Sequence, residues 1–291
     1  MTDSSVAAKS CQLALLLELS ITPKPGLVDR ISRTSEFSHF LASAVALHDF
    51  FHSAALGSVR LGRLIENACR EMLAWQRGGN THLGAILLLI PLAAAFPRAG
   101  GVGKMRRALE DVLHGMDYRD TVALFRAVSR VGPGGLGRVA FLDVGQSRTF
   151  ERISRLRIGV LDALKPYKDF DVVAHEYTTS YEASYRYGYK YLKREVDSGK
   201  DANEAGVNTF LNILANMPDT HVARRQGKPA ARALSNMARK VLAAGGYSTS
   251  RGRSALNEMR SKVLRAGYRP AATADVLAAA FCILLLDGWR P

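Results

Sequence analysis

The sequence contains little cysteine, and the cysteines present are not arranged for metal binding or cross-linking. Only three occur among 291 residues, and Cys11, Cys69 and Cys282 lie far apart, each within an apolar stretch. Because there is no Cys-x-x-Cys pair, neither a zinc knuckle nor a disulfide framework is expected. This cysteine usage favours a protein of the reducing cytoplasm.

Long hydrophobic runs are also missing. The longest apolar segments, 83–96 and 276–286, are shorter than the ~20 residues that a transmembrane helix needs. The apolar run at 13–19 contains Glu18 and follows no basic segment, which is atypical of a signal peptide. We therefore expect no membrane partner, and we expect both long segments to form buried helices.

The chain has no convincing alternating strand pattern, no repeat of fixed period and no low-complexity tract. Apolar residues instead recur at helical spacing, and 47% hydrophobic residues exclude disorder as the dominant state. The sequence predicts an all-α protein, a single compact multi-helix globule of roughly eleven helices forming one domain over 1–291. Helices are predicted at 37–56, at 118–131 with Asp117 as its cap, at 149–164 and at 172–194. A capping-box arrangement at 201–204 is expected to open a helix that ends near 216, and Pro91 is expected to kink the helix at 83–96.

Acidic residues are scarce relative to basic ones. There are 40 Lys and Arg against 26 Asp and Glu, a formal net charge of +14, and 29 of the 40 cations are Arg. Residues 221–270 hold twelve cations and one acid, Glu258. This stretch is either a solvated surface or a polyphosphate-binding wall that includes Arg224 and Arg225. Nucleic acid is not the favoured partner, because aromatic residues suited to base stacking are not interleaved with the charges.

A proline-rich motif at 23–29 (Pro-Lys-Pro-Gly-Leu-Val-Asp) brings together a cation and a carboxylate. Two prolines stiffen the backbone around Lys24 and hold its ammonium in place between helices. Gly26 permits a close backbone approach, and Asp29 supplies a carboxylate five residues after the lysine. A structural turn does not need both charged residues, so this motif is predicted to be functional.

A second motif at 78–84 (Gly-Gly-Asn-Thr-His-Leu-Gly) enters the most apolar predicted helix. Unpaired N–H groups and the positive end of the helix dipole make a helix start suitable for binding an anion. Asn80 or Thr81 can also act simply as the N-cap of that helix. His82 is a candidate proton donor or phosphate ligand.

Two later acids and one glycine-rich segment complete the set of candidates. Asp219 precedes the Arg224–Arg225 pair, and Asp275 opens the last apolar helix, where either acid can be a plain helix cap. The segment 132–137 matches Gly-x-Gly-x-x-Gly, but a predicted helix precedes it. A dinucleotide-binding unit needs a strand at that place, so this interpretation is rejected.

Together, these motifs resemble the triphosphoribosyl-dephospho-CoA synthase family, which serves the maturation of citrate lyase and malonate decarboxylase. The segment 23–29 matches the family's first block without a change, and 80–84 resembles its Asn-Thr-His-Lys-Gly block. The Asp-Thr at 219–220, the Thr-Ala-Asp at 273–275 and the Phe-Leu-Ala-Ser at 40–43 also resemble family elements. The resemblance covers most of the chain, in order.

The sequence also departs from the family pattern. Leu83 stands where the family has a lysine, which removes one phosphate-directed cation, and His221 stands where Asn is common. Only Thr34 and Glu36 represent the acidic pair that often precedes the Phe-Leu helix. These differences resemble a divergent, archaeal-type branch of the family.

The resemblance implies a glycosyl transfer from ATP to 3′-dephospho-CoA. The acceptor 2′-hydroxyl attacks C1′ of the ATP ribose, adenine leaves, and the intact triphosphate travels with the ribose. Such a step passes through an oxocarbenium-like state, helped by a base on the hydroxyl and an acid on the purine. Mg²⁺ is expected with ATP and would take one or two carboxylates.

Roles for individual residues follow as expectations. Asp29 and Asp219 are expected to act as general base or metal ligands, an ambiguity that the sequence leaves open, and His82 as proton donor to adenine or phosphate ligand. Glu18 and Glu71 are expected to complete the metal carboxylates. The residues expected to bind the nucleotide are Lys24, Gly26, Gly79, Asn80, Thr81, Gly84, Arg224, Arg225 and Asp275.

Three alternatives of different classes stay open. A related transferase could use a nucleotide with another acceptor, which the Leu83 departure motivates. An RNA-binding module built on 221–270 would bind with an affinity that falls steeply with salt. A catalytically inactive nucleotide sensor would bind ATP without releasing adenine. The sequence specifies no oligomeric state.

Overall fold

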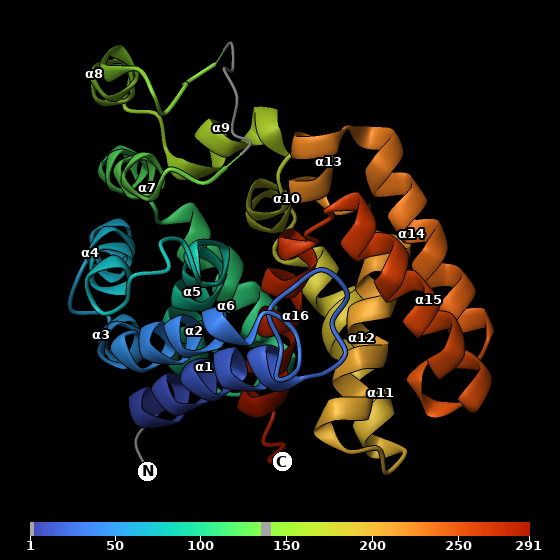
Figure 1. The fold of residues 1–291 in the computed structure, drawn as a ribbon. Helices are drawn as coiled ribbons and strands as arrows, with labels where there is room; N and C mark the ends of the chain where they lie inside the picture. The colour runs from blue at the N-terminus through green and yellow to red at the C-terminus, as the bar shows by residue number, and fades with distance from the viewer. Residues whose placement is uncertain (1–2, 135–140) are drawn as a thin grey trace. The chain divides into compact units, whose positions relative to one another are not determined.

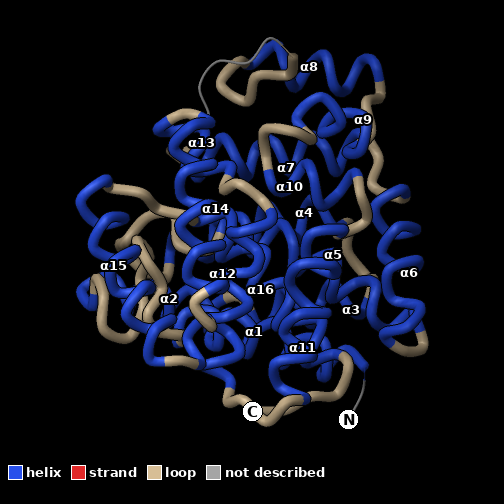
Figure 2. Tube along the Cα trace, turned by 90° about the vertical axis from the view of Figure 1, so that its right-hand side faces the viewer, coloured by secondary structure: helices blue, strands red, loops and turns tan. Residues whose placement is uncertain are grey.

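All regular secondary structure in the described residues is helical, as predicted (Figure 1). The computed structural model describes residues 3–134 and 141–291, and no strand occurs in those ranges (Figure 2). The described helices are labelled α1 to α16, so the prediction of roughly eleven helices is wrong.

The difference in helix number arises from short breaks and one missed helix. The predicted helix at 37–56 is divided at Leu47 into α2 (Thr34–Ala46) and α3 (His48–Leu56). The one at 149–164 is divided where Arg157 adopts a left-handed conformation, with φ 52°. Apolar periodicity continues across such breaks because the helices on both sides bury an apolar stripe, so periodicity alone does not reveal them.

By their internal contacts, the residues form two compact units. The first unit consists of Met1–Leu13 and His39–Tyr181, and the second of Ala14–Ser38 and Glu182–Pro291. The chain passes from one to the other within α1 (Asp3–Ser20) and α2. The single-domain assignment over 1–291 stays a prediction.

The first unit is built around the apolar helix α5 (Leu83–Ala99). Pro91 lies inside α5 and has no N–H to give to the carbonyl of Leu87. The hydroxyl of Tyr177 donates to that carbonyl at 2.6 Å, and the hydroxyl of Tyr181 donates to the carbonyl of Leu88 at 2.8 Å. Besides α3 and most of α2, this unit contains α4 (Leu61–Ala74), α6 (Val102–His114), α7 (Tyr118–Val131), α8 (Ser147–Leu156), α9 (Val160–Leu164), the 3₁₀ turn η1 (Lys165–Tyr167) and α10 (Val172–Thr178).

The second unit is built around α12 (Ala202–Asn216) and the apolar helix α16 (Ala271–Leu286). The capping-box arrangement expected at the start of α12 is present in part, because the Asp201 carboxylate accepts from the backbone N–H of Glu204 at 2.8 Å. The remaining elements of this unit are the π-helix η2 (Ser184–Tyr189), α11 (Lys190–Asp197), α13 (Thr220–Gln226), α14 (Lys228–Ala243), the 3₁₀ turn η3 (Gly246–Ser248) and α15 (Ser250–Ala266).

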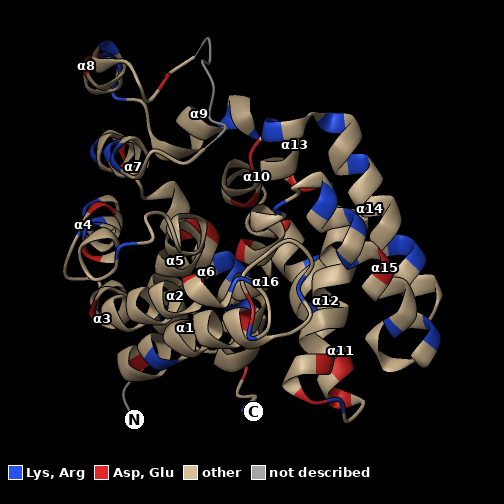
Figure 3. Ribbon diagram, viewed as in Figure 1, with Lys and Arg blue, Asp and Glu red and all other residues tan. Residues whose placement is uncertain are grey.

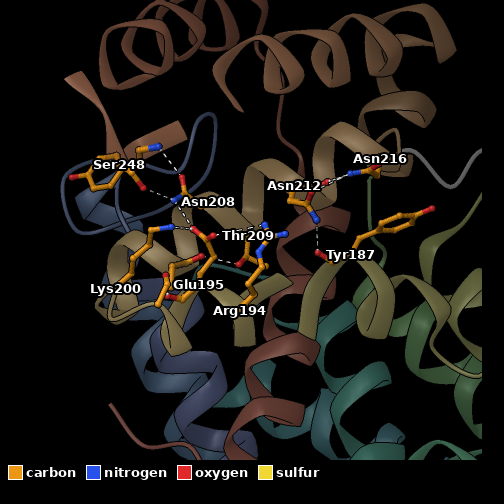
Figure 4. Close-up of polar contacts among 12 residues, drawn as sticks. Tyr187, Arg194, Glu195, Lys200, Asn208, Thr209, Asn212, Asn216 and Ser248 are labelled. Carbon is orange, nitrogen blue, oxygen red and sulfur yellow. Dashed lines mark hydrogen bonds and ion pairs between the residues drawn. The ribbon is translucent and has the colours of Figure 1, made fainter. Parts of the chain in front are cut away.

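Side-chain amides link the elements of the second unit. Figure 4 shows Asn212 donating to the backbone carbonyl of Tyr187 in the π-helix at 2.8 Å. It also shows the Glu195 carboxylate, which accepts from Lys200 at 2.7 Å and from Asn208 at 2.8 Å. Glu195 is buried, so these donors supply the partners that a buried carboxylate needs. The network joins α11 to α12.

The hydrophobic segments do not include a single-helix membrane span. In residues 3–134 and 141–291, no one helix is both long enough and apolar enough to cross a bilayer. The helices α5 and α6, which are bent by 119° relative to each other, reach the length and apolar composition of a span only when they are taken together.

Candidate functional site

The proline-rich motif of the second unit places Lys24 at the C-terminal end of α1. Its ammonium donates to the backbone carbonyl of Glu18 at 2.6 Å and forms an ion pair with the Glu18 carboxylate. The last carbonyls of a helix have no partner within the helix, and a cation is favoured near them. Lys24 is 2% exposed, and Glu18 is likewise buried.

Burial of Glu18 has an electrostatic consequence. Desolvation raises the pKa of its carboxyl above the ordinary value, and the charge and hydrogen bond of Lys24 oppose that shift. An ammonium has three donor hydrogens. Within the described ranges, two of those of Lys24 have protein partners, both on Glu18.

Asp29 organises the backbone of the same motif. One carboxylate oxygen accepts from the N–H of Lys24 at 2.8 Å, and the other accepts from Ile31 at 2.9 Å and Ser32 at 2.6 Å. Asp29 is fully buried. It therefore fixes the backbone that carries Lys24, which is a positioning role. Its predicted role as base or metal ligand stays a prediction.

Gly26 is a close-packing position, as the sequence suggested. Its φ is +81°, and a Cβ atom built on it would lie 2.2 Å from the backbone carbonyl oxygen of Tyr268. Thr22, the residue before the motif, is held by Asn203. The Asn203 side chain accepts from the N–H of Thr22 at 2.7 Å and donates to the Thr22 carbonyl at 2.9 Å. Asn203 was not singled out from the sequence, because it occupies an ordinary helix-start position.

Asp219 lies at the start of α13 and ties that helix to α16. Its carboxylate accepts from the N–H of Val222 at 2.9 Å, and from both the N–H and the hydroxyl of Thr273 at 2.8 Å. Asp219 and Thr273 are both fully buried. Burial raises the pKa of the Asp219 carboxyl, and the hydrogen bonds from Val222 and Thr273 oppose the shift. The Asp-Thr and Thr-Ala-Asp elements are thus joined in space by one carboxylate.

The second motif, in the first unit, forms the entry to α5. The Asn80 side chain accepts from the backbone N–H of Leu83 at 3.1 Å. The N-cap residue of α5 is His82, so the expectation that Asn80 or Thr81 is the N-cap is wrong. Gly79 has φ +74°, and nothing lies within 4 Å of a Cβ built on it. Gly84 lies in the first turn of α5. Asn80 and Gly79 are exposed, so this turn is open to solvent.

A buried hydroxyl chain leads to His82 in the same motif. The Thr81 hydroxyl lies 2.8 Å from the Ser43 hydroxyl, which in turn lies 2.6 Å from Nδ1 of His82. Ser43 is fully buried, His82 is 4% exposed, and the ring of Phe40 meets the imidazole edge-on at 5.1 Å. Ser43 was not assigned a role from the sequence, although Phe-Leu-Ala-Ser was one of the recognised elements.

The remaining predicted residues lie on helices of their own units. Arg224 and Arg225 are in the last turn of α13, and Asp275 is in α16. Figure 3 shows Lys and Arg along α13, α14 and α15, the stretch that the sequence marked as basic. Glu71 lies in α4 of the first unit, half-buried. The Gly132–Gly137 segment lies partly outside the described residues.

Asp29 and Asp219 are two of the carboxylates that were expected to bind a metal. In the described parts of the chain, no group of three or more His, Cys, Asp or Glu side chains is placed to hold a metal ion. Magnesium is usually held by one or two carboxylates together with phosphates. Asp29 and Asp219 each accept three protein hydrogen bonds, and a carboxylate offers about four acceptor positions. Both side chains are also fully buried, and their role as metal ligands stays a prediction.

Comparison with known proteins identifies the family. The family model described as ATP:dephospho-CoA triphosphoribosyl transferase matches residues 4–291. The chain belongs to this family. Its relatives in the transferase family include a protein of Azotobacter vinelandii assigned as a 2-(5″-triphosphoribosyl)-3′-dephosphocoenzyme-A synthase. It is 30% identical over 296 residues, which cover 96% of this chain and 89% of the relative.

Two further proteins extend the comparison. The 2-(5″-triphosphoribosyl)-3′-dephosphocoenzyme-A synthase of Klebsiella pneumoniae is 27% identical over 286 residues, covering 94% of this chain and 91% of the relative. A crystal structure of a protein from Archaeoglobus fulgidus, assigned as a triphosphoribosyl-dephospho-CoA synthase, superposes with a TM-score of 0.68 at 24% identity. It covers 86% of this chain and 100% of that protein, so the two share a fold.

Proposed function

We propose that this protein is a triphosphoribosyl-dephospho-CoA synthase, which transfers the triphosphoribosyl group of ATP to the 2′-hydroxyl of 3′-dephospho-CoA and releases adenine. The observation that carries the proposal is the family match over 4–291, which spans both predicted motifs. In this reaction the bond from C1′ to adenine breaks, a bond from C1′ to the acceptor oxygen forms, and the proton released by the hydroxyl balances the one that adenine takes up. The triphosphate stays on the ribose.

We assign Lys24 to a phosphate of the nucleotide. Glu18 holds the ammonium at the end of α1 through two contacts, so its direction is fixed before substrate arrives. Its third hydrogen has no protein partner in the described ranges and is the one we assign to the phosphate. Asp29 supports this group by holding the Lys24 backbone N–H at 2.8 Å.

We assign His82 as the group that assists departure of adenine. If Thr81 donates to Ser43 and Ser43 donates to Nδ1, the neutral imidazole carries its proton on Nε2. A neutral ring with a protonated Nε2 can donate a hydrogen bond to a nitrogen of the leaving purine, which accumulates negative charge as the glycosidic bond breaks. Ser43 is then a positioning residue that selects this tautomer.

Magnesium would serve this reaction by neutralising the triphosphate. It would be held mainly by phosphate oxygens, with Asp29 or Asp219 as the protein carboxylate. No part of the residue assignment depends on which of the two takes it.

The proposal is tested by measuring adenine with and without the acceptor. Purified protein is incubated with ATP and Mg²⁺, with 3′-dephospho-CoA present or omitted, and adenine is quantified by chromatography. We expect adenine only when 3′-dephospho-CoA is present. Adenine formed at the same rate with coenzyme A, whose 3′-phosphate adjoins the acceptor hydroxyl, would favour a transferase with a different acceptor. ATP binding without adenine under any condition would indicate a nucleotide sensor.

A further inference from the structure

Three chain segments of the second unit bring arginines together beside the proline-rich motif. Arg33 lies in the loop that follows Asp29, Arg225 in α13, and Arg269 in the turn before α16. Arg225 was expected to bind nucleotide, but nothing in the sequence linked it to Arg33 or Arg269. In the sequence, Arg225 and Arg269 lie 192 and 236 residues after Arg33.

Hydrogen bonds on either side of the cluster fix these segments. Arg260 in α15 donates to the hydroxyl of Ser32 at 2.8 Å, which holds the loop that carries Arg33. Nδ1 of His221, in α13, lies 2.8 Å from the carbonyl oxygen of Arg269. Gly26 packs against the carbonyl of Tyr268, the residue before Arg269. The three guanidinium groups therefore extend from anchored backbone.

The positive charges in this cluster are close enough to affect one another. Partial burial lowers the pKa of Arg269, and the charges of Arg33 and Arg225 lower it further, whereas Glu36 opposes the change. Arg33 forms an ion pair with Glu36. Among the described residues, neither Arg225 nor Arg269 has a carboxylate within ion-pair distance. The cluster holds more positive charge than its own acids neutralise.

Gathering guanidinium groups without matching acids is unfavourable unless an anion occupies the space among them. Guanidinium is suited to phosphate, because its planar fork gives two parallel hydrogen bonds to two oxygens. We propose that Arg33, Arg225 and Arg269 form a binding site for a phosphate or diphosphate group of a nucleotide substrate. This inference rests on the proposed function, in which both substrates carry such groups: the triphosphate of ATP and the diphosphate of 3′-dephospho-CoA.

The rest of the basic stretch differs from this cluster. On α15, Lys262 forms an ion pair with Glu258 one helical turn away, at 2.6 Å. Arg232 on α14 is exposed, as Arg225 and Arg269 are, but its charge is not among those that act on Arg269. Arg232 therefore provides a matched control for the loss of one arginine.

The test measures equilibrium binding of ATP, of 3′-dephospho-CoA and of inorganic tripolyphosphate to the full-length protein. The variants are Arg225→Ala, Arg269→Ala and Arg33→Gln, and the control is Arg232→Ala. At position 33, where the backbone has φ 54°, glutamine is chosen because it removes the positive charge and keeps a long, polar side chain. Thermal unfolding of each variant checks that folding is retained.

We expect each cluster variant to bind tripolyphosphate about ten-fold more weakly or worse, as for a lost charged hydrogen bond, while Arg232→Ala binds as the parent does. Weaker binding of ATP alone places the triphosphate at the cluster, and weaker binding of 3′-dephospho-CoA alone places its diphosphate there. Unchanged binding of all three ligands by folded variants would overturn the inference. An equal loss in Arg232→Ala would also overturn it, since general surface charge would then explain the affinity.

Adenine release by the parent separates the two claims. If the parent releases adenine with 3′-dephospho-CoA and the variants bind all ligands normally, the arginine site is wrong and the proposed function stands. If the parent releases no adenine with any acceptor but the variants lose tripolyphosphate binding, the site stands and the proposed function is wrong.

Discussion

The Ser43 hydroxyl lies 2.6 Å from Nδ1 of His82, and both side chains are buried in the first unit. The two residues are on different helices, since Ser43 is in α2 and His82 immediately precedes α5. A buried hydroxyl bound to one imidazole nitrogen fixes the orientation of the ring. In the proposed arrangement, where Ser43 donates to Nδ1, the ring proton lies on Nε2.

Replacing Ser43 tests this relationship. We expect Ser43→Ala to lower kcat by about ten-fold or more with little change in KM, because stabilisation of the leaving purine depends on the orientation of the His82 Nε2–H donor. The pH dependence of kcat should shift as well, and Ser43→Thr, which keeps the hydroxyl, should restore much of the rate. A Ser43→Ala enzyme with parental kcat and pH profile would show that His82 does not depend on this contact.

The effect of removing Lys24 on protein stability should depend strongly on whether Glu18 is still present. Lys24→Met leaves a buried carboxylate without its cation, and we expect it to lower the free energy of unfolding by about 3–5 kcal/mol. The double variant Glu18→Gln and Lys24→Met should recover much of that loss, because no buried charge is left alone. Denaturant unfolding of the parent, both single variants and the double variant measures this coupling. Additive effects of the two substitutions would rule it out.

The same variants predict a pH dependence. In Lys24→Met, burial still raises the pKa of Glu18 above its ordinary 4.5, and the lysine no longer opposes the shift. The folded state then binds a proton more tightly than the unfolded state, so the free energy of unfolding falls as pH rises from 4.5 through the raised pKa. We therefore expect the deficit of Lys24→Met relative to the parent to grow over this range. Adding Glu18→Gln to Lys24→Met should abolish this pH-dependent increase in the stability deficit.

Gly26 and Gly79 form a matched pair for testing backbone packing. Both have positive φ, but a Cβ at Gly26 would lie 2.2 Å from the Tyr268 carbonyl oxygen, while one at Gly79 meets nothing within 4 Å. Gly79→Ala should lower the free energy of unfolding by about 1–2 kcal/mol, the cost of a left-handed alanine. Gly26→Ala should cost more, because overpacking adds about 1–3 kcal/mol. Thermal or denaturant unfolding compares the two, and equal losses would contradict the packing role of Gly26.

Local signals in the sequence predicted a large part of the fold. The helix at 118–131 was predicted with the bounds that the structure has, and Asp117 caps it as expected. The long apolar segments are buried helices, and the three cysteines are buried. The short helix α13 was missed because it spans seven residues, fewer than a periodic apolar pattern needs in order to be recognised.

Long-range contacts in the site could not be read from the sequence. Asp219 and Thr273 were noted as separate elements, and only the fold shows that one carboxylate joins them across 54 residues of chain. Asp29 was expected to act as base or metal ligand, which stays a prediction, and its three contacts with the loop backbone could not be read from the sequence. Motif reading identifies which residues matter, but the partner of a carboxylate is set by tertiary packing.

The central claim is that the triphosphoribosyl group of ATP is transferred intact with loss of adenine. The most direct measurement is mass spectrometry of the product formed from 3′-dephospho-CoA and ATP labelled with ¹⁸O in the γ-phosphate. We predict a single adduct of the two substrates minus adenine, with the labelled phosphate retained and adenine formed in equal amount. Labelled phosphate or pyrophosphate appearing free in solution, with adenine still bound to its ribose, would contradict the account.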